Sequence, residues 1–173
     1  YRSDNAISND YLYHNIGDSV ILYTQDGKVL KQEEVSSYPC VGEDRPGLRY
    51  FRSVRTTGLN ENTVVALFSA RPLNTGTSYM KMWMPASSDV SYFTALAPGA
   101  KTASSPYQNK PSLVVTMRKE KPAVKEPFVA VYEPISDKVS AGLIESVDRV
   151  KLDPQGEEGC AIKVNTKEGD TFT

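Results

Sequence analysis

Short stretches in which hydrophobic and polar residues alternate recur along the whole chain, and they predict β-strands. The stretch YMKMWM at residues 79–84 places its three methionines on one face and Tyr79, Lys81 and Trp83 on the other. Similar short runs rich in β-branched and aromatic residues lie at 19–23, 48–57, 63–69, 90–96, 113–118, 128–133, 143–152 and 160–166. No segment carries a sustained apolar repeat of helical period, and the nearest approach to one is at residues 31–36.

Turn-forming residues separate these runs. Asp26 and Gly27, between the run at 19–23 and Val29, form the strongest short hairpin signal in the chain. Prolines lie at the ends of the runs at 113–118 and 128–133, and we expect Pro134 to end the second one. The pattern predicts an all-β fold, an antiparallel β-sandwich of two packed sheets with little helix.

Length and charge narrow the classes of protein. The 173 residues contain no internal repeat or linker, so we expect residues 1–173 to form a single domain. Lys and Arg number 20 against 21 Asp and Glu, so no overall field favours nucleic acid or an anionic membrane as partner. No apolar run approaches the roughly 18–20 residues of a membrane span. The chain starts at Tyr1 rather than Met, which is consistent with a fragment or C-terminal part of a larger protein.

The residues that would carry chemistry are few. His14 is the one histidine, and the sequence contains no GxSxG, P-loop or GxGxxG pattern. A metal site needs several ligands at suitable spacing, and the neighbouring acidic residues lie in polar loops. We therefore expect no catalytic residue, metal or cofactor in this chain. Cys40 and Cys160 could pair in an oxidising compartment or remain as two free thiols.

Candidates for binding are aromatic and basic. Trp83 and Tyr79 share a strand face and could stack on sugar rings, although large aromatic residues on alternating positions usually fill a sandwich core. Arginines are densest between residues 45 and 55, where Arg49 and Arg52 could bind carboxylates of an acidic polysaccharide or of a partner protein. Strict alternation places Arg52 on the face opposite Arg49 and Arg55. An ordinary solvated sheet face is the alternative.

Three stretches in this order resemble a known family. They are DYLYHNIG at 10–17 with the following hairpin turn, MWMP at 82–85 running on to APG at 97–99, and the tract from Leu113 to Val147 with FVAVYEP at 128–134. Together they are similar to the C-terminal β-domain of heparinase II/III-like polysaccharide lyases, and the likeness runs from about Asp10 to the C-terminus.

This resemblance implies a supersandwich-like β-domain that packs on a helical catalytic toroid. Such lyases cleave polysaccharides containing uronic acids by β-elimination, with catalytic residues mainly on the helical part. The zinc site of some relatives needs several histidines, and DYLYHN matches a structural strand, so we transfer no catalytic residue and no metal ligand. The resemblance also implies a periplasmic or extracellular location.

Three functions therefore remain open at this stage. The chain could be a β-domain that braces a helical catalytic domain and contacts an acidic polysaccharide through Trp83, Tyr79, Arg49, Arg52 and His14. It could instead be a stand-alone carbohydrate-binding module, with Trp83 and tyrosines as the stacking surface. The third alternative is a domain that binds other proteins through an exposed apolar patch.

Overall fold

The computed structural model describes residues 2–4, 11–12, 20–37, 49–72, 78–87, 89–98, 111–119, 127–136, 142–151, 160–169 and 171–172. These residues form β-strands joined by turns and include no α-helix, so the predicted all-β class is confirmed. Consequently, none of them belongs to a helix that is long and apolar enough to cross a membrane. The strands are β1 (Arg2–Asp4), β2 (Tyr11–Leu12), β3 (Ile21–Thr24), β4 (Glu33–Glu34), β5 (Arg52–Leu59), β6 (Val64–Pro72), β7 (Ser78–Met84), β8 (Val90–Ala97), β9 (Ser112–Lys119), β10 (Val131–Ser136), β11 (Ile144–Val150), β12 (Ala161–Thr166) and β13 (Thr171–Phe172).

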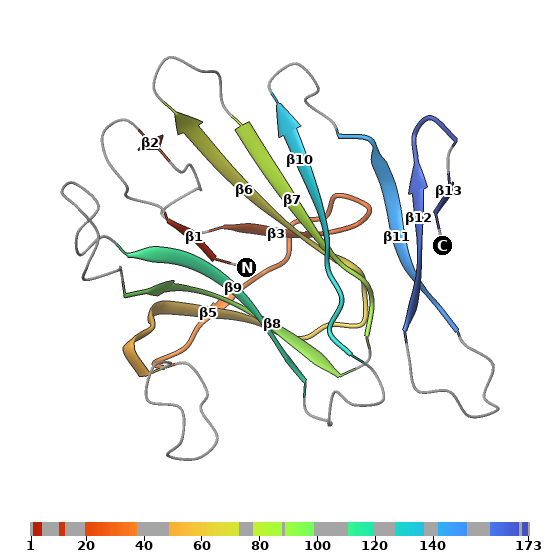
Figure 1. Cartoon of the computed structure of the whole chain (residues 1–173). Coiled ribbons are helices and arrows are strands. Elements are labelled where there is room, and N and C mark those ends of the chain that lie inside the picture. Colours follow the sequence, from red (N-terminus) through yellow and green to blue (C-terminus); the bar gives the residue numbers. More distant parts are fainter. Residues whose placement is uncertain are drawn as a thin grey trace.

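The strands form three antiparallel sheets (Figure 1). The first sheet has the order β1-β9-β8-β5-β4. The second has the order β10-β7-β6-β2, and β3 also pairs with β6. The third contains β11, β12 and β13, and it lies beside β10 at the C-terminal side of the molecule (Figure 1).

The main core lies between the first and second sheets. The methionine face of β7 points into it, as the alternation predicts, and Met82 and Met84 are buried there. Tyr92 from β8 and Leu113 from β9 meet them from the first sheet, and Leu22 from β3 completes the contact. Each large apolar side chain buried in this layer contributes about 1.5–3 kcal/mol of hydrophobic free energy. The layer is therefore the main source of stability of the sandwich.

The third sheet makes the structure differ from a plain two-sheet sandwich. Its Val147 is fully buried against Val65 and Trp83 of the second sheet, on the face that points away from the main core. Ile162 and Val164 of β12 pack around this contact. The second sheet is therefore covered on both faces over part of its area, which explains why residues of opposite strand parity are buried there.

Two β-bulges interrupt the pairing of β5 with β8. The register shifts between Arg52 and Arg55 and again between Thr56 and Leu59. Ser53 has a φ of 50° in the first bulge, and Gly58 has a φ of 68° in the second. A bulge inserts one extra residue and so reverses the alternation of side chains beyond it. Arg52 and Arg55 therefore lie on the same face of the first sheet, and the expectation of opposite faces was wrong.

Three other local predictions can be compared with the structure. The hairpin turn at Asp26 and Gly27 is confirmed, with the Gly27 amide donating to the Thr24 carbonyl at 2.8 Å. Residues 31–36 contain the short strand β4 rather than a helical turn. Pro134 lies within β10 instead of ending it, because β10 is the edge strand of its sheet and a proline there need not donate to a neighbour.

The two bulges provide a reciprocal test of backbone strain. Ser53→Gly should raise the free energy of unfolding by about 0.5 kcal/mol, because relief of the left-handed conformation outweighs the added flexibility of glycine. Gly58→Ala should lower it by about 1 kcal/mol, since its added Cβ meets open space but must adopt the same conformation. Urea unfolding followed by circular dichroism measures both changes. A loss of stability in Ser53→Gly would show that the serine side chain stabilises this bulge.

Candidate functional site

The outer face of β7 carries the aromatic pair that the sequence singles out. Trp83 is 3% exposed because Val65 of β6 and Val147 of the third sheet cover its ring. It has no free face on which a sugar could stack, so the expectation of a stacking role is corrected in favour of core packing. Tyr79 lies four residues earlier on the same face and is half-buried. Any contact of Tyr79 with a ligand stays a prediction.

A buried carboxylate lies beside Trp83. Glu133 of β10 is 6% exposed, and its Oε2 accepts a hydrogen bond from the Trp83 indole Nε1 at 3.1 Å. Its Oε1 accepts from the backbone amides of Leu143 and Ile144, the second at 2.8 Å, where the third sheet begins. The same carboxylate approaches Gly142 so closely that an added Cβ would collide with Oε1. Only glycine fits there, and its φ of 71° suits glycine as well.

This arrangement fastens two sheets together and does not resemble a general base. A catalytic base must reach a proton of the substrate, whereas both oxygens of Glu133 are occupied by protein donors below the surface. Two further contacts fasten the third sheet in the same way. Gln25 accepts from the Val147 amide at 2.9 Å, and Thr63 donates to the Val147 carbonyl at 3.0 Å.

Burial and nearby charges shift the pKa values of two side chains close to Glu133. Burial, and then the negative charge of Glu133, raises the pKa of Tyr23 to about 12. Burial also lowers the pKa of Lys81, with Glu133 opposing that effect and Lys167 adding to it. The Lys81 ammonium lies 5.5 Å from the centre of the Trp83 ring, within the range of a cation–π contact. Trp83 is thus held by a carboxylate at its edge and a cation over its face.

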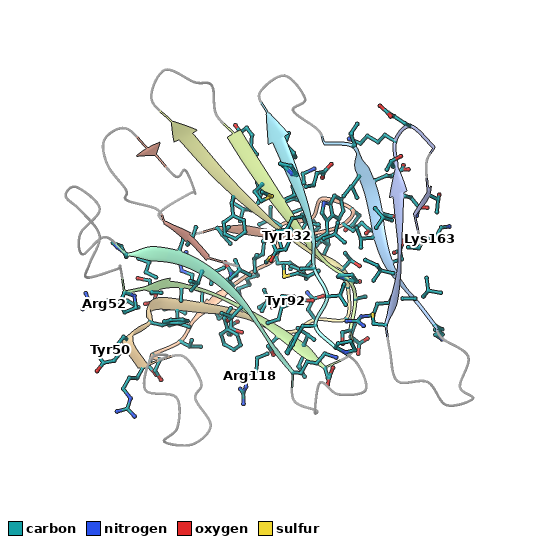
Figure 2. The ribbon with its side chains drawn as sticks, viewed as in Figure 1. Tyr50, Arg52, Tyr92, Arg118, Tyr132 and Lys163 are labelled. Carbon is teal, nitrogen blue, oxygen red and sulfur yellow. The ribbon has the colours of Figure 1, made fainter. Side chains whose placement is uncertain are left out.

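The exposed basic residues lie elsewhere, at one end of the first sheet. Arg49 and Tyr50 precede β5 and Arg52 begins it; all three are exposed, with Tyr50 at 61%. Figure 2 shows Tyr50 and Arg52 at the end of the molecule opposite Lys163 of the third sheet. The structure therefore does not bring Arg49 and Arg52 together with Trp83 and Tyr79. We call Arg49, Tyr50 and Arg52 the basic strip.

His14 and Cys40 lie outside the described residues. Cys160 is a free thiol whose Sγ accepts from Arg149 Nη1 at 2.7 Å. Within the described part of the chain, no three His, Cys, Asp or Glu side chains converge as a metal site requires.

The sequence patterns did not reveal one buried ion pair. Lys119 Nζ of β9 lies 3.6 Å from Asp89 Oδ1, and the two side chains are 3% and 9% exposed. The Ser87 hydroxyl donates to the same carboxylate oxygen at 3.2 Å. No local pattern predicts this contact, because Asp89 and Lys119 come together only through the pairing of β8 with β9.

Comparison with known proteins adds one relative. The chain is 36% identical over 140 residues to an endo-acting ulvan lyase of Formosa agariphila, an alignment that covers 78% of this chain. The chain is therefore similar to part of a polysaccharide lyase. It corresponds to 17% of the length of that enzyme. No protein-family model and no solved structure matches it.

The contact between Glu133 and Trp83 can be tested by substitution. Glu133→Gln keeps one oxygen for the backbone amides but turns an NH₂ group toward the indole N–H. The free energy of unfolding should fall by about 1–3 kcal/mol, because a buried donor loses its acceptor. Urea unfolding measured by circular dichroism gives the value. Trp83→Phe removes the same donor and should cost less in the Glu133→Gln background than in the wild type.

A matched control is Glu145→Gln on β11, which removes an exposed carboxylate and should change stability by less than about 0.5 kcal/mol. Equal losses in the two Glu→Gln variants would refute a special role for Glu133.

Tyr23 gives a prediction for alkaline pH. The folded domain holds its phenol proton to about pH 12, whereas the unfolded chain releases it near 10.0. Between these values the folded state binds more protons, so the free energy of unfolding falls as the pH rises. Tyr23→Phe should make this fall shallower without abolishing it, because burial also raises the pKa of Tyr92 to about 12. Urea unfolding at a series of pH values measures the slope, and an unchanged slope would place the proton uptake on other groups.

Proposed function

We propose that the chain is a non-catalytic β-sandwich domain of a polysaccharide lyase, and that it contacts an acidic polysaccharide. The observation that carries this proposal is the 36% identity to an ulvan lyase across most of the chain. The relative is an endo-acting ulvan lyase by name. A domain that adds polymer contacts away from the reacting bond would support such an activity.

The chemistry of this chain supports a binding role rather than a catalytic one. The sequence has one histidine, and Glu133, one of two acidic residues of the described part that are 6% exposed, serves as a structural acceptor. The exposed basic strip offers positive charge and an aromatic ring, which an acidic polysaccharide could contact. Arg49 and Arg52 supply guanidinium groups that can bind carboxylates in a bidentate manner, and Tyr50 supplies an exposed ring. Tyr79 and His14 remain further candidates for contact.

The finer part of the proposal concerns the rest of the protein. The resemblance to heparinase II/III-like lyases favours a helical catalytic domain that this domain braces. An enzyme that degrades an external polymer also needs a periplasmic or extracellular location, which we propose for this protein. Both points rest on the resemblance and on the relative, because the chain aligns with only 17% of that enzyme.

Binding and cleavage by the 173-residue chain test the proposal together. In affinity electrophoresis, gels containing ulvan should retard the chain, and gels containing uncharged dextran should not. Rising salt should weaken the retardation, because it screens charges about 10 Å apart at 0.1 M. The absorbance of unsaturated uronate products should stay constant when the chain is incubated with ulvan. Turnover by the chain alone would overturn the non-catalytic role, and equal mobility in all gels would overturn the binding role.

A further inference from the structure

The two faces of β10 differ in how far they are covered. Glu133 on one face is 6% exposed, whereas Tyr132 and Pro134 on the other face are exposed, Tyr132 at 45%. The partners of Tyr132 and Pro134 on β7 are Met82 and Met80, whose side chains belong to the main core. Because β10 is the edge strand of its sheet, its part of the methionine face extends beyond the main core and meets solvent.

The exposed face continues into the segment before β10. Ala130 packs against the main core, so it points to the same side as Tyr132, two residues later. The same alternation predicts that side for Phe128, which is 45% exposed. Ala130 is the smallest of the three side chains and lies between the two aromatic ones. The two exposed rings are therefore separated by a low position on the surface.

We call Phe128, Ala130, Tyr132 and Pro134 the β10 strip, and it is too narrow for a stable protein partner. Such a contact buries about 800 Å² on each partner and takes roughly 20–30 residues. The strip is one strand wide. The other exposed large hydrophobic residues of the described part lie on other elements: Val29, Tyr50, Leu59, Leu143 and Val150. A strip of this width suits a single polymer chain.

The chemistry of the strip suits sugar units of such a polymer. A tyrosine offers an apolar ring and a hydroxyl group at its edge, as a sugar does. Partial burial raises the pKa of Tyr132, so its hydroxyl keeps its proton and can donate to a carboxylate. Tyr132 and Pro134 are about 6.6 Å apart along the strand, a spacing comparable with the length of one sugar unit.

We propose that Phe128 and Tyr132 stack on sugar rings of one acidic polysaccharide chain, which lies along β10. This inference rests on the proposed function and adds a polymer contact on the second sheet to that of the basic strip. The pairing of residues 131–136 with β7 is regular, so the Tyr132 ring is held on a formed strand before a ligand arrives. A preformed surface avoids the cost of ordering side chains on binding.

Affinity electrophoresis of the 173-residue chain over a series of ulvan concentrations gives the Kd that tests the strip. Tyr132→Ala should raise Kd about five- to tenfold, the loss expected when one aromatic stacking contact is removed. Phe128→Ala should also raise it, and the double variant more than either. Tyr132→Phe keeps the ring and should retain most of the affinity. An equal loss in Tyr132→Phe and Tyr132→Ala would refute stacking.

A matched control comes from the opposite margin of the second sheet. Val29 is 66% exposed and bridges to Tyr23 of β3, which is separated from β10 by β6 and β7. Val29→Ala therefore removes exposed apolar surface outside the strip and should leave Kd unchanged. Circular dichroism of each variant verifies that the fold is retained.

Salt separates stacking from charge. The ratio of Kd between Tyr132→Ala and the wild type should stay constant as salt rises, because salt screens charges and not ring contacts. A ratio that falls toward one at high salt would show that Tyr132 acts through a charged contact and would refute stacking.

The outcomes distinguish this inference from the proposed function. If ulvan retards the wild type and either ring variant binds equally well, the β10 contact is refuted while the binding role stands. The same holds if sedimentation shows that Tyr132→Ala turns a dimer into a monomer without a change in Kd, because the strip is then an interface between copies. If ulvan does not retard the wild type, both the strip and the proposed function are refuted.

Discussion

The buried carboxylate of Glu133 is the contact on which the arrangement of the second and third sheets depends. A charged group removed from water is tolerated only when hydrogen bonds replace its hydration. Glu133 obtains them from the Trp83 indole and from two backbone amides at the start of the third sheet. The indole belongs to the second sheet and the two amides lie at the start of the third sheet. The carboxylate therefore obtains all its hydrogen bonds only when the third sheet is docked. The close approach of Gly142 follows from the same requirement.

This contact also decides which part of the molecule can meet a ligand. The docked third sheet covers Trp83 and uses the outer face of the second sheet for packing. The main core occupies the opposite face of the second sheet except along its edge strand, so exposed basic and aromatic side chains lie at the end of the first sheet and on β10. Two bulges shape the end of the first sheet, and the apolar cluster around Val54 holds the first of them in place. On β10, packing and proposed binding use opposite faces of one strand.

Local patterns predicted the strands well where one face of a strand is buried and the other is not. The methionines of β7 follow this rule, and the turn at Asp26 and Gly27 has the residues that its conformation needs. The patterns failed where the environment of a strand changes along its length. β10 contains Pro134 because it is an edge strand, and edge position depends on which strands pair rather than on the residues of β10 alone.

By itself, the sequence determined the all-β class and the strand faces of the main core, because these follow from side-chain type and a period of two. Only the tertiary structure decided the role of Trp83 and the direction of Arg52. Trp83 is buried by residues more than sixty positions away on β11, which no local pattern encodes. Arg52 faces the same side as Arg55 because one extra residue is inserted opposite β8, and such a bulge is defined by pairing between distant strands.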